Sequence, residues 1–163
     1  YKCFGITTAG KEEMVVVGDC GNNKCCWSLI RDGREVSYSD QYDSTSGWYY
    51  IALNNSNTCV YVTVCNKNSL HCFNMEGKKL YTYSPDNLKS PLGVAVDRDD
   101  NIYVVGCGSH NIHQLSPEGC LIQVITTGVP QNPWAICFYN SSDTFIITNN
   151  SIEKKIVHIF QLK

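Results

Sequence analysis

The sequence has no long apolar run, and no window comes near the roughly 18 unbroken apolar residues that a membrane-spanning helix requires. It also has no excess of charge of one sign, because 13 Lys and Arg stand against 15 Asp and Glu, for a net charge of -2. These absences exclude a membrane span and argue against a basic nucleic-acid surface. With 43% hydrophobic and 17% charged residues, the 163-residue chain can build one folded domain and is too apolar for a disordered tail.

Helical periodicity is nearly absent as well. Short runs rich in β-forming residues recur instead, and the clusters of Gly, Asn, Asp, Ser and Pro between them are typical of turns. These runs occupy residues 14–17, 60–64, 93–97, 102–105, 120–126 and 145–148. Many short strands separated by regularly spaced turns predict a barrel, a sandwich or a propeller.

The β-rich blocks repeat with a period of 42 residues. The sequence at 101–104 matches that at 59–62, and the block at 91–96 reappears at 133–138. Four strands within such a period are typical of one blade of a β-propeller. We therefore expect an all-β protein, a β-propeller built from four-stranded blades.

We expect one domain over residues 1–163, with about four blades. Their approximate limits are 1–45, 46–88, 89–131 and 132–163. The last blade is expected to lack its outer strand, because the run at 156–162 is its third strand. The chain starts at Tyr1 rather than at Met, without a charged-then-apolar leader, so we expect it to be processed, trimmed or cut from a longer protein.

The third repeat, residues 91–119, resembles an NHL repeat, which is written P-x-G-[VI]-A-[VF]-D, then N-[IL]-Y-V-x-D, then [IV]-x-x-F and a turn glycine. The resemblance is strong only for residues 59–137. The aspartate usual after the second strand survives as Asp19, whereas Cys65 and Cys107 take that place in the next two blades. Such propellers end invertebrate tripartite-motif proteins of the TRIM-NHL-like kind.

This resemblance implies a six-bladed ring, of which the chain would supply the last four blades. The alternatives are a compact four-bladed ring and a ring shared by two chains. Open blade edges are prone to aggregation, and the apolar run at 156–160 would be such an edge. We predict that the chain closes on itself or forms a homodimer through its terminal blades, and that changing Val157 and Ile159 to lysine disrupts the assembly.

No catalytic motif is found. The sequence has no G-x-S-x-G elbow and no phosphate-cradling glycine loop, so we expect neither an enzyme nor a cofactor. Any ubiquitin-ligase activity implied by the resemblance would lie in a RING domain outside this chain. Cys107, His110 and His113 form the nearest metal pattern, but a loop histidine, a strand histidine and a packed thiol explain it better, and we predict no metal site.

The ten cysteines and three N-x-S sequons help to decide between a cytoplasmic and a secreted protein. Adjacent blades usually separate equivalent positions such as Cys65 and Cys107 too far for a disulfide, and thiols pack well in strands. We therefore favour reduced cysteines and a cytoplasmic protein, with a secreted protein as the alternative. The sequons, which matter only in that second case, are at Asn54, Asn140 and Asn149.

The loops that join the second and third strands, and those that join the blades, are expected to meet on one face. Exposed polar groups with one or two aromatic rings on a rigid scaffold are typical of a recognition surface. The candidate binding residues are Asp19, Asn22, Asn23, Lys24, Trp48, Asn66, Lys67, Asn68, Ser109, His110, Asn111, Trp134 and Lys154. We expect a protein partner. The alternatives are a carbohydrate, as in a lectin-like or defence propeller, and RNA, which the lack of arginine in these loops disfavours.

Overall fold

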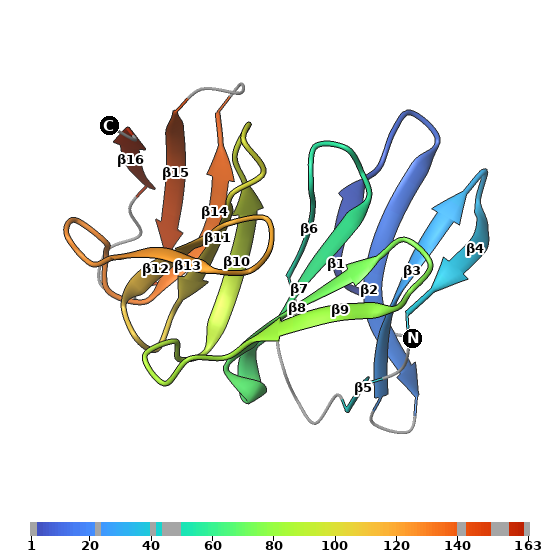
Figure 1. Cartoon of the computed structure of the whole chain (residues 1–163), viewed down its shortest axis with the longest axis horizontal. Coiled ribbons are helices and arrows are strands. Elements are labelled where there is room, and N and C mark those ends of the chain that lie inside the picture. The colour runs from blue at the N-terminus through green and yellow to red at the C-terminus, as the bar shows by residue number, and fades with distance from the viewer. Residues whose placement is uncertain are drawn as a thin grey trace.

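The computed structural model of the chain describes residues 3–21, 24–39, 42–43, 50–139, 143–150 and 157–161, with their side chains except at 3–4, 19–21, 24–25 and 42–43. Its strands form four antiparallel sheets. Each sheet is one blade, and the blades follow one another in chain order from right to left in Figure 1, with their innermost strands around a common recess. The all-β propeller of about four blades that the repeat predicts is confirmed.

Blades 1 and 2 come from the first half of the chain. Blade 1 contains β1 (Cys3–Thr8), β2 (Glu13–Gly21), β3 (Lys24–Arg31) and β4 (Arg34–Tyr38) in this order, and β5 (Tyr42–Asp43) also pairs with β3. Blade 2 contains β6 (Ile51–Leu53), β7 (Cys59–Val64), β8 (Ser69–Asn74) and β9 (Lys79–Tyr83), with the short 3-10 helix η1 (Cys65–Lys67) between β7 and β8.

Blades 3 and 4 come from the second half. Blade 3 contains β10 (Pro91–Val96), β11 (Ile102–Gly106), β12 (Asn111–Leu115) and β13 (Leu121–Ile125). Blade 4 contains β14 (Pro133–Phe138), β15 (Thr144–Asn149) and β16 (Val157–Gln161). Within the described residues blade 4 has three strands, as expected from the sequence.

The sequence repeat corresponds to an equivalent register in blades 2 and 3. Tyr61 of β7 pairs with Ala52 of β6, and Tyr103 of β11 pairs with Ala95 of β10. Both tyrosines are buried. The repeated tyrosine is therefore a packing residue of the second strand, which explains why it recurs with the blade.

Two kinds of glycine account for other repeated positions. Gly77 and Gly119 have φ angles of 86° and 84°, which favour glycine in the turns between third and fourth strands. Gly93 of β10 instead permits a close approach between blades, since a Cβ there would lie 2.9 Å from the Cα of Ala135 in β14. The glycine at the start of the third repeat thus brings two innermost strands together.

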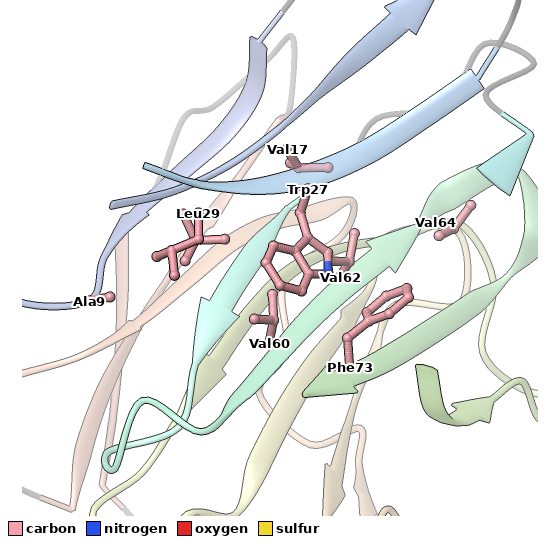
Figure 2. Packing of buried hydrophobic residues seen from close by; sticks show 9 residues of the cluster. Ala9, Val17, Trp27, Leu29, Val60, Val62, Val64 and Phe73 are labelled. Carbon is pink, nitrogen blue, oxygen red and sulfur yellow. The ribbon is translucent and has the colours of Figure 1, made fainter. Parts of the chain in front are cut away.

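The first two blades share a core around Trp27 of β3. Figure 2 shows Trp27 beside Val60 and Val62 of β7, with Phe73 of β8 close to its ring. The rings of Trp27 and Phe73 meet edge to face with their centroids 6.2 Å apart. This geometry is favourable for aromatic pairs and fixes the angle between the blades.

Each further pair of successive blades has its own cluster among the described residues. Tyr61, Leu70 and Ile102 lie in the cluster between blades 2 and 3. Tyr103 and Phe145 lie in the cluster between blades 3 and 4. Full burial of one large apolar side chain contributes about 1.5–3 kcal/mol, so these clusters, more than the loops, hold the blades together. No helix in the described part of the chain is long and apolar enough to cross a membrane.

Candidate functional site

The blades present two faces. The first-turn face carries the turns between the first and second strand of each blade, such as the β1–β2 and β6–β7 turns along the upper edge of Figure 1. The connection face carries the β7–β8 and β11–β12 loops and the connections from blade to blade. The sequence-predicted binding residues were expected to gather on the connection face.

The structure places these residues in three groups. Four lie outside the described residues: Asn22, Asn23, Trp48 and Lys154. Two lie in strands rather than loops, with their side chains not described: Asp19 in β2 and Lys24 in β3. The other seven are described: Asn66, Lys67, Asn68, Ser109, His110, Asn111 and Trp134. Of these, Asn111 and Trp134 also lie in strands, because β12 and β14 extend further than the sequence pattern indicates.

Asn68 and His110 make equivalent hydrogen bonds one blade apart. Asn68 Oδ1 accepts from the backbone N–H of Ser90 at 2.8 Å, and His110 Nδ1 accepts from that of Asn132 at 3.1 Å. All four residues have positive φ angles between 47° and 53°. Each side chain thus joins the loop between the second and third strands of its blade to the connection that leads to the next blade. These two predicted binding residues therefore stabilise the connection face.

Ser109 and Asn111 belong to a similar network. Ser109 Oγ accepts from the backbone N–H of Lys89 at 3.0 Å and donates to Asn111 Oδ1 at 2.7 Å. Asn111 Nδ2 donates to the carbonyl oxygen of Asn87 at 2.9 Å. Asn111 is buried, and so is Leu88 between these contacts. The network therefore fixes the connection between blades 2 and 3.

Trp134 lies in a cluster of polarisable groups from three blades. Its indole donates a hydrogen bond to the hydroxyl of Tyr50. Burial raises the pKa of Tyr50, and the nearby Cys107 raises it further. Burial also raises the pKa of the Cys107 thiol, with a smaller contribution from Cys65. Cys65 and Cys107, expected at equivalent positions, interact electrostatically and are both free thiols.

A recess on the first-turn face is the cavity that all four blades share. It has a volume of about 450 Å³ and is bounded by the innermost strands β1, β6, β10 and β14 and by the β6–β7 turn. Its polar lining consists of Thr7, Thr8, Asn54, Asn55 and Asn57. The sequence carries no pattern for this recess, because its residues are separated by up to 131 positions and meet only in the folded chain.

The three asparagines make the rim of the recess rigid. Asn55 Nδ2 donates to Asp97 O and to Asp100 Oδ1 of blade 3, at 2.8 Å each. Asn57 Nδ2 donates to the carbonyl oxygen of Ala9 in blade 1 at 2.8 Å. The β6–β7 turn therefore connects three blades around the recess.

Asn54, which is also a sequon, is used inside this turn. Its Oδ1 accepts from the backbone N–H groups of Thr58 and Cys59, and its Nδ2 donates to the hydroxyls of Ser56 and Thr58. The residue is only 9% exposed. The amide nitrogen that a glycan would modify is thus engaged in the fold. Of the other sequons, Asn149 lies in β15 and Asn140 lies outside the described residues.

A second cavity, which we call the lysine groove, lies on blade 2. It has a volume of about 380 Å³, and its polar lining consists of Lys67, Ser69, His71, Lys79, Thr82 and Ser84. Ser69 Oγ and His71 Nε2 lie 3.1 Å apart in a hydrogen bond. Burial and the charge of Lys79 lower the pKa of His71 to about 4, so its ring is neutral at physiological pH. Lys67 is the one sequence-predicted binding residue in this groove.

The two histidines of the pattern Cys107, His110 and His113, for which we predicted no metal site, have separate partners. His113 is fully buried in β12 and its Nδ1 lies 2.7 Å from the hydroxyl of Tyr83, whereas His110 accepts from Asn132. Among the described residues, no group of three or more His, Cys, Asp or Glu side chains is placed to hold a metal ion.

Four successive antiparallel blades with their innermost strands around one recess define the chain as a β-propeller. No protein-family model matches the sequence, and no curated protein matches it. Many solved structures resemble the fold.

Three of them illustrate the likeness. The β-propeller domain of Cps50 (Swd1) from Myceliophteria thermophila has a TM-score of 0.74 at 13% identity, over 99% of this chain and 54% of that chain. Streptogramin B lyase has a TM-score of 0.67 at 18% identity, over 99% and 55%. A functionally unknown protein from Desulfotomaculum acetoxidans has a TM-score of 0.77 at 14% identity, over 99% and 52%. The chain spans about half the length of these structures, and the likeness shows the fold alone.

Proposed function

We propose that the chain is a non-enzymatic binding module whose recess on the first-turn face holds a segment of a protein partner. The observation that carries this proposal is the recess itself, a cavity of about 450 Å³ framed by the innermost strands of four blades. Concave sites on rigid scaffolds are where binding residues concentrate. The asparagine contacts that connect blades 1, 2 and 3 supply that rigidity.

The chemistry of the recess favours a polypeptide over the alternative ligands. Its described lining offers hydroxyl, amide and apolar groups and contains no lysine, arginine, aspartate or glutamate. A nucleic-acid backbone would require cations there. A sugar ring would require an exposed aromatic face, and the one aromatic residue of the described lining, Phe138, packs in the core between blades 3 and 4. A neutral peptide segment presents matching donors, acceptors and apolar side chains.

We also propose that the chain is the substrate-recognition part of a TRIM-like protein with NHL-type blades, and that it works in the cytoplasm. The NHL-like pattern of residues 91–119 supports the first point. The seven cysteines whose side chains the structure describes are free thiols, and the Asn54 amide is engaged in the fold; both observations suit a reducing compartment without glycosylation. Counting reactive thiols after denaturation tests this: ten support the cytoplasmic protein, and none would support the secreted one.

Matched arginine substitutions test the binding proposal. Thr8 is exposed and lines the recess, whereas Thr126 is also exposed and lies outside its lining. Thr8→Arg places a long charged side chain in the recess, so proteins captured by the unchanged chain should be lost from this variant and kept by Thr126→Arg. Capture of the same proteins by the Thr8→Arg chain, or capture that depends on RNA and disappears with ribonuclease, would contradict the proposal.

A further inference from the structure

Polar side chains of β8 and β9 line the bottom of the lysine groove. Strand alternation places Ser69, His71 and Phe73 of β8 on one face of the sheet. His71 pairs with Thr82 of β9, which brings the Thr82 hydroxyl beside its ring. Ser69 is 2% exposed, so its hydroxyl lies at the bottom of the groove and not on the surface.

The charges of the groove are of one sign. Its described lining contains Lys67 and Lys79 and no carboxylate, and neither lysine forms an ion pair with a described residue. The His71 ring, which lines the same groove, is neutral because burial and Lys79 disfavour its protonation. Two lysines in a groove lined with hydroxyl groups therefore create a local positive potential in a chain whose net charge is -2.

We propose that the lysine groove binds a phosphate monoester, carried by a phosphorylated side chain of the protein partner. A phosphate group offers three strong acceptor oxygens and close to two negative charges, which ammonium and hydroxyl donors can satisfy together. RNA fits less well, because the described lining contains no arginine and no aromatic ring on which a base could stack. This inference rests on the proposed function and adds a second contact point on the same partner.

Titration with inorganic phosphate tests the site directly. Backbone amide signals of Ser69, His71 and Thr82 should shift in nuclear magnetic resonance spectra. Lys79→Gln should weaken the binding of phosphate by about tenfold, the value of one charge-assisted hydrogen bond. Lys89→Gln is the matched control, because Lys89 is an exposed lysine of the blade 2–3 connection and is outside the lining. Absent shifts, or equal affinities in the two variants, would overturn the site.

Two further experiments identify the source of the phosphate. A peptide with one phosphoserine should bind more tightly than its unmodified form, and oligouridylate should not displace it. Displacement by oligouridylate would overturn the assignment to a protein. Phosphatase treatment of the extract separates this inference from the proposed function: capture that survives the treatment but is lost with Thr8→Arg supports the function and overturns the phosphate site.

Discussion

Replacing Asp97 with alanine should destabilise blade 3 more than any other change to a surface turn of that blade, because its carboxylate organises the β10–β11 turn. Asp97 Oδ1 accepts from the backbone N–H groups of Asp99 and Asn101, at 2.9 Å each. Asp97 Oδ2 accepts from Asn101 Nδ2 at 2.9 Å and from the hydroxyl of Tyr103 at 3.2 Å. Asp97 is only 7% exposed.

The loss can be estimated from these contacts. A hydrogen bond to a charged group contributes about 1.5–3 kcal/mol, and a buried donor left without an acceptor costs about 1–3 kcal/mol. The backbone donors of Asp99 and Asn101 lie near the surface and can turn to water. The Tyr103 hydroxyl belongs to a fully buried residue and cannot. Asp97→Ala should therefore lower the free energy of unfolding by about 3–4 kcal/mol.

Urea denaturation followed by tryptophan fluorescence measures this change. Asp99→Ala is the control, because the Asp99 side chain is 71% exposed and should contribute no more than about 0.5 kcal/mol. Adding Tyr103→Phe to Asp97→Ala should restore about 1 kcal/mol, since it removes the unpaired hydroxyl. Equal losses for Asp97→Ala and Asp99→Ala, or no recovery in the double variant, would refute the reasoning.

Three further predictions concern packing, pH and thiol chemistry. Gly93→Ala should destabilise the fold by about 1–3 kcal/mol in the same assay, because a Cβ at this position would lie 2.9 Å from the Cα of Ala135. The free energy of unfolding should be nearly constant between about pH 6.5 and 8 and should fall as the pH drops toward 4. Burial holds the pKa of His71 at about 4 against 6.5 for the free side chain, so the unfolded chain binds more protons in this interval. The decrease should reach up to about 3 kcal/mol and become smaller in His71→Gln, as titrated by circular dichroism. At neutral pH, iodoacetamide should modify the exposed Cys120 well before Cys72, whose pKa burial raises to about 12, as peptide mapping by mass spectrometry can show.

The repeat allowed most of the fold to be predicted, because each repeated residue has a local structural reason. Tyr61 and Tyr103 recur since the second strand of each blade needs a buried ring at that register. Gly77 and Gly119 recur since their turns require positive φ angles. Such requirements depend on neighbours in the same blade. Because each blade imposes them again, the residues recur at a fixed spacing in the sequence.

The candidate site was less predictable, because contacts between blades determine it. Asn68 and His110 look like exposed loop residues, yet each accepts a hydrogen bond from a connection 22 residues further along the chain. Their common offset of 42 residues was a usable signal, since recurring polar residues at one blade position suggest a structural role. No recurring residue in the sequence indicates the recess or the lysine groove. Residues such as Ser69 and Thr82 come together only when the strands pair.

Photo-cross-linking from the recess tests the central claim most directly. A benzophenone amino acid at Thr8 would face the cavity framed by the four innermost strands, and the same group at Thr126 would lie outside its lining. We expect adducts with protein from the Thr8 position that protease removes and ribonuclease does not, with little product from Thr126. Adducts with RNA, or equal protein adducts from both positions, would contradict it.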